Sequence, residues 1–184
     1  MKTATSKDIG DRVLGASKND FNGFPHRLIN SDDIELLGFK WLMRNDPLIL
    51  HEELPQEPII YNLDDVNGAG THWIVIYDNG KNVYHYNPLG NIHQLPMQDI
   101  IDYSKRVGRP LVTNPYNHQP SQSNLCGHFS LYLALIIRDL INRGIPLTKK
   151  LYKQILLRTH GPSSDIMDVE RVLAPLRKPL NLKV

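Results

Sequence analysis

The sequence predicts an α+β fold in which a mainly antiparallel central sheet is flanked by helices. Two runs rich in Ile, Val, Tyr and Trp, "PIIYNL" (58–63) and "THWIVIY" (71–77), are typical of strands. The second run leads into Asn79-Gly80, the strongest short signal for a β-hairpin. A segment over about 125–143 is apolar on nearly every side, which indicates a buried central helix. Since 41% of the 184 residues are hydrophobic, we expect a single domain over 1–184 with its own core.

The elements before the central helix are predicted in chain order. In "INSDDIELLGFKWLMRN", Ser31 is a plausible N-cap and apolar residues recur at helical spacing as far as Leu42, so we expect a first helix there. A loop rich in Pro and Glu follows, and then the two strands and the hairpin. "PMQDIIDYSKRV" (96–107) has the pattern of an amphipathic helix on the sheet, and "PLVTN" (110–114) that of a short strand.

The C-terminal third is predicted to be helical. Gly144 and Pro146 end the central helix. Two further helices are expected, over 148–159 and over about 164–173. No repeat, low-complexity tract or linker divides the chain.

Composition narrows the possible functions. The net charge is +2, and the sequence contains no run of Lys or Arg that could bind along a phosphate backbone. Nucleic acid is therefore neither required nor excluded as a partner. A single cysteine forms no intrachain disulfide and no cysteine-rich zinc site, and the histidines lack metal spacing, so we expect no metal or other cofactor. The N-terminus lacks the apolar segment of a signal peptide, and the longest apolar stretch (129–137) is far short of the roughly 20 residues of a membrane span. We therefore expect a soluble protein.

The hairpin brings a histidine and an asparagine together. If Asn79-Gly80 forms a two-residue type I′ turn, counting back along both strands sets His72 opposite Asn87. Directly opposed residues have Cβ atoms about 4.5–5.5 Å apart and share one face of the sheet. The imidazole and the carboxamide are therefore predicted neighbours, whereas a three-residue turn would shift the register by one and separate them.

Cys126, the only cysteine, begins the apolar helix and is the candidate nucleophile. The N–H groups and the positive dipole end at a helix N-terminus stabilise a thiolate, and His72 is the candidate base that takes its proton. The amide oxygen of Asn87 would bind the other ring nitrogen and so set the tautomer of His72. Gln119, seven residues before the cysteine, is the natural donor to an oxyanion, with Gln122 close enough to compete. Taken alone, however, a lone cysteine in such a place is more often a buried core residue.

The other histidines are weaker candidates for the base. His85 would share a face of the hairpin with His72 and could be mistaken for it. His128 follows Cys126 by two positions on a helix, so the two side chains point apart. His118 is expected to face solvent or to form a hydrogen bond within its loop.

Three ordered motifs carry a resemblance to a known family. The motifs are "NLDDVNGAGTHWIVIY" (62–77), "VYHYNPLG" (83–90) and "QPSQSNLCGHF" (119–129), with "DDIELLGF" (32–39) before them. They resemble the adenain-like (adenovirus-type) cysteine proteases, including those of Polinton-like elements and virophages, in the papain-like clan shared with SUMO proteases. The order His, Asn, Gln, Cys is also that of the family.

The resemblance implies a papain-like/adenain-like fold, with the nucleophile at the N-terminus of the central helix. It implies a cysteine endopeptidase with a Cys126–His72–Asn87 triad and Gln119 as the oxyanion donor. The implied substrates are viral structural (capsid) precursors cleaved during virion maturation, by a monomer acting in the virion or in the host cytoplasm or nucleus. A DNA or peptide activator is left open.

Two departures from the family concern mechanism. Many relatives carry Asp or Glu in place of Asn87, so here the third member can orient the imidazole but not offset its charge. The disulfide that tethers the adenoviral activating peptide cannot be copied, because Cys126 is the only cysteine. Two alternatives remain: a deconjugating isopeptidase for SUMO-like or ubiquitin-like tails, which shares every catalytic residue, and an inactive capsid-associated binding module.

Overall fold

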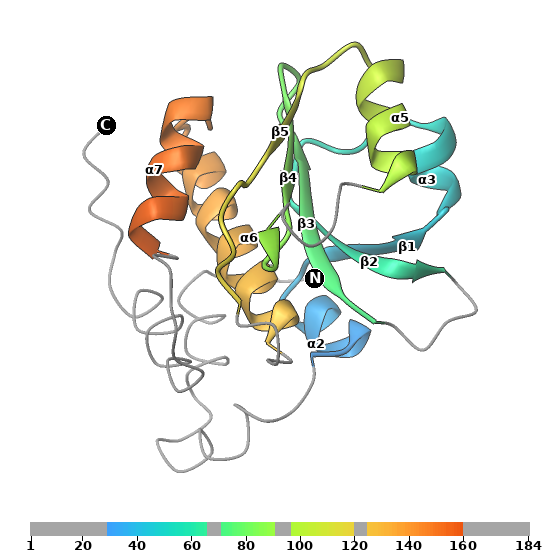
Figure 1. Cartoon of the computed structure of the whole chain (residues 1–184), viewed down its shortest axis with the longest axis horizontal. Helices are drawn as coiled ribbons and strands as arrows, with labels where there is room; N and C mark the ends of the chain where they lie inside the picture. The colour runs from blue at the N-terminus through green and yellow to red at the C-terminus, as the bar shows by residue number, and fades with distance from the viewer. Residues whose placement is uncertain (1–28, 66–70, 91–96, 120–124, 160–184) are drawn as a thin grey trace.

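The computed structural model describes residues 29–65, 71–90, 97–119 and 125–159. Within these ranges a five-stranded mixed sheet is flanked by helices (Figure 1). The elements are α2 (Ser31–Leu36), β1 (Lys40–Arg44), α3 (Pro47–His51), β2 (Ile59–Asp65), β3 (Trp73–Asp78), β4 (Val83–Tyr86), α5 (Gln98–Arg106), β5 (Leu111–Thr113), α6 (Cys126–Asn142) and α7 (Lys149–Thr159).

The sheet order is β1-β2-β3-β4-β5, and its pairing is mixed. The central pairs, β2–β3 and β3–β4, are antiparallel, whereas the outer pairs, β1–β2 and β4–β5, are parallel. The expectation of a mainly antiparallel sheet is therefore wrong. Its physical reason is connectivity: α3 follows β1 and α5 follows β4, and each carries the chain back so that the next strand runs parallel to the last.

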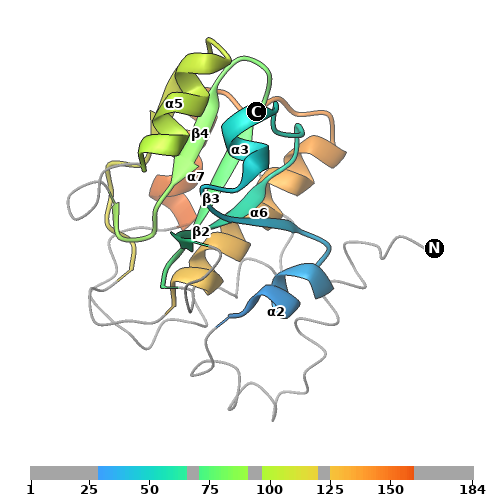
Figure 2. The ribbon, with the colours of Figure 1, turned by 90° about the vertical axis from the view of Figure 1, so that its right-hand side faces the viewer.

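Side-chain alternation along the strands divides the core in two. On β3, Ile74 and Ile76 face the cluster that includes residues of α3 and α5, while Val75 and Tyr77 face the cluster built around α6 and α7. The helices accordingly cover opposite faces of the sheet, as Figures 1 and 2 show. In both views α2 lies beside the N-terminal end of α6.

The first helix is shorter than the spacing predicts. Its N-cap is Asn30 rather than Ser31, because the side chains of Asn30 and Asp33 each accept the other's backbone N–H in a capping box. Gly38 then takes φ +71, the left-handed conformation that ends a helix. The stretch up to Leu42 is strand β1 rather than helix, and α3 lies in a segment expected to be a loop.

The later elements confirm their predictions closely. α5, β5 and α7 lie within the predicted ranges, and α6 begins at Cys126. Gly144, at φ +66, follows the C-cap of α6 as expected. The helix predicted over 164–173 lies outside the described residues. None of the helices in the described part of the chain combines the length and apolar character needed to cross a membrane.

The β3–β4 hairpin forms, but its turn differs from the prediction. Asp78 pairs with Val83, which leaves a four-residue loop over 79–82. Gly80 has φ +79 but Asn79 does not share a positive φ, so there is no type I′ turn. The register is therefore offset by two residues. Because side chains alternate with a period of two, each one keeps its predicted face.

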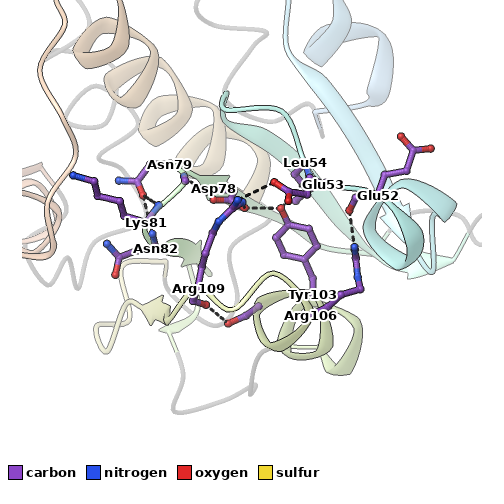
Figure 3. A network of polar contacts seen from close by, with 12 residues as sticks. Glu52, Glu53, Leu54, Asp78, Asn79, Lys81, Asn82, Tyr103, Arg106 and Arg109 are labelled. Atoms are coloured by element: carbon purple, nitrogen blue, oxygen red, sulfur yellow. Dashed lines mark hydrogen bonds and ion pairs between the residues drawn. The ribbon is translucent and has the colours of Figure 1, made fainter.

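A polar network holds this turn end of the hairpin (Figure 3). The buried carboxylate of Asp78 accepts hydrogen bonds from the Tyr103 hydroxyl and from Arg109 Nη1, each at 2.5 Å. Its other oxygen accepts the N–H of Gly80 at 2.8 Å. Arg109 also pairs with Glu53 at 2.8 Å. The charge of Asp78 is thus compensated where the hairpin turns.

Candidate active site

His72 and Asn87 lie at the other end of the hairpin, which we call its open end. His72 immediately precedes β3 and Asn87 immediately follows β4. Their predicted direct opposition is wrong, because the longer loop makes them diagonal neighbours. Side chains at diagonal positions on one face can still meet. Here His72 Nε2 lies 2.8 Å from Asn87 Oδ1, so the predicted contact between imidazole and carboxamide is present.

The hydrogen bonds of Asn87 define the tautomer of His72. The Asn87 atom that faces the ring also accepts the N–H of Leu89 at 3.0 Å, which identifies it as the amide oxygen. His72 Nε2 must therefore be the donor, and Nδ1 carries the lone pair of the neutral ring. Burial lowers the pKa of His72 below its ordinary value, and the hydrogen bond to Asn87 opposes that shift. At neutral pH the ring is a neutral base with its basic position at Nδ1.

A second asparagine holds the backbone of Asn87. Asn114, the residue after β5, is fully buried. Its Oδ1 accepts the N–H of Asn87 at 2.8 Å, while its Nδ2 donates to the Asn87 carbonyl at 2.8 Å and to that of Tyr116 at 2.9 Å. Asn114 is not predictable from sequence patterns, because the contact spans 27 residues and depends on the pairing of β4 with β5. The Asn114-Pro115 pair signals only a turn.

Gln119 is brought to the same place through its backbone. The N–H groups of His118 and Gln119 both donate to the carbonyl of Pro88 at 2.9 Å. A Cβ on Gly90 would lie 2.7 Å from the Tyr116 carbonyl oxygen, so the loops after β4 and β5 are in close backbone contact. The side chain of Gln119 is buried, with 3% of its surface exposed. Its competitor Gln122 lies outside the described residues.

Cys126 is the first residue of α6 and is 8% exposed. Burial raises the pKa of its thiol, and hydrogen bonds from the N–H groups of Trp73, Gly127 and Cys126 itself partly offset this. Because Trp73 directly follows His72, the sulfur contacts the backbone next to the histidine. Ser130 fixes this arrangement by donating to the Trp73 carbonyl at 2.9 Å. Among the described residues no hydrogen bond joins the thiol to the imidazole. Because burial lowers the pKa of His72 and raises that of Cys126, the neutral form of each group is favoured at neutral pH.

Ile29 covers the start of α6. A Cβ on Gly127 would lie 2.5 Å from Ile29 Cβ, so the absence of a side chain there lets the two segments touch. The Ile29 carbonyl accepts a hydrogen bond from the Trp73 indole at 2.8 Å. The chain that leads into α2 is therefore fastened to both the strand and the helix that carry the site.

The other histidines of this region are also buried. Burial, with a smaller contribution from the charge of His72, lowers the pKa of His85 to about 4. Burial lowers the pKa of His118 to about 4 as well. His118 does not face solvent: its Nδ1 lies 3.3 Å from the Tyr86 hydroxyl and its ring stacks on that tyrosine. His128 is buried within α6.

The arrangement combines a neutral base of defined tautomer with a thiol at a helix N-terminus. A buried glutamine lies in the loop whose backbone binds Pro88, the residue after Asn87. No group of three His, Cys, Asp or Glu side chains that could hold a metal ion occurs within the described ranges. A scan against protein-family models and a search of curated proteins found no match for the chain.

Proposed function

We propose that the protein is a cysteine endopeptidase with Cys126 as its nucleophile, His72 as its base, Asn87 as the orienting residue and Gln119 as an oxyanion donor. The observation that carries the proposal is the 2.8 Å hydrogen bond from His72 Nε2 to Asn87 Oδ1. This bond makes Nε2 the donor and Nδ1 the basic nitrogen of the neutral ring. The ring belongs to the residue before Trp73, whose backbone the Cys126 sulfur contacts. A buried polar pair of purely structural use does not require this placement.

In the first half of the reaction, the Cys126 proton passes to His72 Nδ1 as the sulfur bonds to the peptide carbonyl carbon. The carbonyl oxygen becomes an oxyanion, which the Gln119 amide and the N–H groups at the start of α6 stabilise. The tetrahedral intermediate then collapses, the C–N bond breaks, and Nδ1–H gives its proton to the leaving amine. Asn87 keeps Nε2–H in place throughout.

In the second half, water attacks the thioester. His72 Nδ1 takes a proton from the water and returns it to the sulfur, which leaves a free carboxylic acid and the original thiol. Asn87 carries no charge to balance the imidazolium, and burial lowers the pKa of His72. Proton transfer in concert with attack therefore suits this site better than a stored thiolate–imidazolium pair.

The substrate class and finer fold rest on the resemblance of the three motifs. They suggest a papain-like/adenain-like enzyme that cleaves viral structural precursors, such as capsid proteins, during virion maturation. The order of the candidate residues along the chain and the cysteine at the first position of α6 support this assignment. A deconjugating isopeptidase would use the same four residues, so the substrate distinguishes the two.

A peptidyl vinyl sulfone ending in glycine tests the chemistry. Because the chain has one cysteine, intact-mass measurement reports modification of Cys126 alone. We expect one adduct per wild-type chain at neutral pH and none on folded His72→Ala within the same time. Asn79→Ala, altered at the turn end, should react like wild type. A folded wild-type protein that forms no adduct would contradict the proposal and favour the binding module.

Product analysis tests the substrate. The protein is incubated with a candidate capsid precursor and, separately, with a SUMO-tail reporter. N-terminal sequencing of discrete capsid fragments that Cys126→Ala does not produce would support the maturation protease. Cleavage of the reporter with an intact capsid protein would instead favour the isopeptidase.

A further inference from the structure

We propose that Asn114 is a positioning residue that orients Asn87, and through it His72, while tying Asn87 to the loop that carries Gln119. This inference rests on the proposed function, since it assigns a role within the same site. Asn114 belongs to none of the motifs that predict the site. In the described part of the chain its side chain makes no hydrogen bond to the imidazole or the thiol, and it acts through the backbone of Asn87.

Asn114 binds the backbone of Asn87 on both sides. Its carboxamide accepts from the N–H of Asn87 and donates to the carbonyl of the same residue, both at 2.8 Å. Two such bonds fix both peptide planes that flank Asn87, as a neighbouring strand would do. They continue the restraint of the sheet past Tyr86, where β4 ends. The direction of the Asn87 side chain is thereby set.

The side chain of Asn87 is then held at its tip. Its Oδ1 accepts from Leu89 N–H at 3.0 Å and lies 2.8 Å from His72 Nε2. Both carboxamides lie in the interior, since Asn87 is 1% exposed and Asn114 is 0% exposed. Water cannot readily replace a lost partner at such a place. A change at Asn114 should therefore move Asn87 rather than be absorbed by solvent.

The third bond of Asn114 extends the restraint to the second loop. Its Nδ2 also donates to the Tyr116 carbonyl at 2.9 Å. Two residues further on, the N–H groups of His118 and Gln119 donate to Pro88, which follows Asn87. One side chain thus connects the orienting residue and the backbone of the oxyanion-donor loop. Only a side chain with one acceptor and two donors can make these three bonds.

Asn79 offers a matched control at the turn end. It too makes three hydrogen bonds: its Oδ1 accepts from Lys81 and Asn82, and its Nδ2 donates to the Leu147 carbonyl. Asn79→Ala therefore removes the same number of bonds from the same hairpin without touching Asn87. An effect that comes only from loosening the fold would appear in both variants.

The first experiment measures the His72 tautomer by ¹⁵N NMR of the full-length protein, with His72 assigned by substitution. Wild type and Asn79→Ala should show the Nε2–H form. In Asn114→Ala we expect a mixture with the Nδ1–H form, and in Asn114→Ser, which keeps one polar group, a smaller change. A His72 tautomer and pKa equal to those of wild type in either folded Asn114 variant would overturn the inference.

The second experiment measures reaction of Cys126 with the peptidyl vinyl sulfone. We expect Asn114→Ala to lower the inactivation rate constant about 10- to 100-fold, because small displacements of catalytic groups have effects of this size, with little change in reversible probe binding. Equal rates in the two proteins would refute the positioning role while the proposed function stands. A wild-type protein that does not react, with a tautomer that still depends on Asn114, would refute the proposed function and support the positioning role.

Discussion

The two ends of the β3–β4 hairpin are built from different chemistry. At the turn end, the buried carboxylate of Asp78 is compensated by Arg109 and by the Tyr103 hydroxyl (Figure 3). At the open end, His72 has a neutral amide as its partner, and a second neutral amide, Asn114, holds that partner in turn. Asp78 and the His72–Asn87 pair are all buried, yet only the turn end contains an ion pair.

Under the proposed function, this difference gives the two ends of one hairpin separate roles. A buried ion pair whose partners are in place resists any change in protonation, because removing either charge leaves the other uncompensated. A buried neutral imidazole held by an amide can gain a proton and lose it again during a reaction. Substitutions at the turn end should therefore change stability, and substitutions at the open end should change reactivity.

The largest expected effect is on catalysis at the open end. Asn87→Ala removes the acceptor of His72 Nε2, so kcat/KM should fall by about 10²- to 10⁴-fold, the range that a positioned base contributes. Asn87→Asp keeps an acceptor, and its negative charge should raise the pKa of His72 and move the acid limb of the pH–rate profile upward. A profile of Asn87→Asp that matches wild type would show that this residue does not act on His72.

The next largest effect is acid destabilisation, which should come from the buried histidines His85 and His118. His85 and His118 each have a pKa lowered to about 4, so the unfolded chain binds protons below pH 6.5 that the folded protein does not. Stability is therefore fully present above pH 6.5 and is lost as the pH falls toward 4. The loss should approach about 1.4 kcal/mol per pH unit for each histidine.

Urea unfolding at a series of pH values measures this loss. His118→Phe keeps a flat ring against Tyr86 and removes one titrating group, so its slope of stability with pH should be shallower than that of wild type by the contribution of one histidine. Parallel pH curves for the two proteins would mean that His118 is not the source of the acid sensitivity.

Removing a charge at the turn end should lower the free energy of unfolding by less than the full protonation of His85 and His118 does. Asp78→Ala leaves the Arg109 guanidinium and the Tyr103 hydroxyl without their buried partner, and we expect the free energy of unfolding to fall by about 3 kcal/mol. Glu53→Ala, at the exposed side of the same network, should cost less than about 1 kcal/mol. The rate of Cys126 labelling per folded molecule should be unchanged in both variants, and a large loss of labelling would break the division between the two ends.

An effect smaller than that of Asp78→Ala is expected at the start of α6. A Cβ at Gly127 would meet Ile29 at 2.5 Å, so Gly127→Ala should lower the free energy of unfolding by about 2 kcal/mol through overpacking. Adding Ile29→Ala should recover part of that loss, because it removes the atoms in conflict. Strictly additive costs in the double variant, measured by urea unfolding, would show that the two residues do not compete for this space.

Local patterns predicted much of the fold, and their failures have local causes. The helical spacing of apolar residues from Ile34 to Leu42 predicted one helix. The left-handed conformation of Gly38 instead ends α2 and lets β1 begin. The signal of Asn79-Gly80 was correct for a hairpin but wrong for its turn, because the Asn79 side chain accepts the N–H groups of Lys81 and Asn82 and stabilises a longer loop.

The contact between His72 and Asn87 was predicted from a type I′ turn that the hairpin does not have. His72 and Asn87 meet as diagonal rather than opposed residues, and they meet because an offset of two preserves the face. Asn114 could not be predicted, since its role arises only when β5 pairs with β4 and brings the two loops together. Hydrogen bonds between loops distant in sequence leave no periodic signal in either loop.

Activation of Cys126 by His72 can be measured through the pH dependence of alkylation of this sole cysteine. The rate constant for reaction with chloroacetamide is measured from pH 4 to 10 in wild type and in His72→Gln. Because burial lowers the pKa of His72 and raises that of the thiol, the wild-type rate should rise in a limb below pH 6.5 and stay high through neutral pH. His72→Gln should react only at alkaline pH, where the thiol ionises alone. Superimposable profiles for the two proteins would contradict the account.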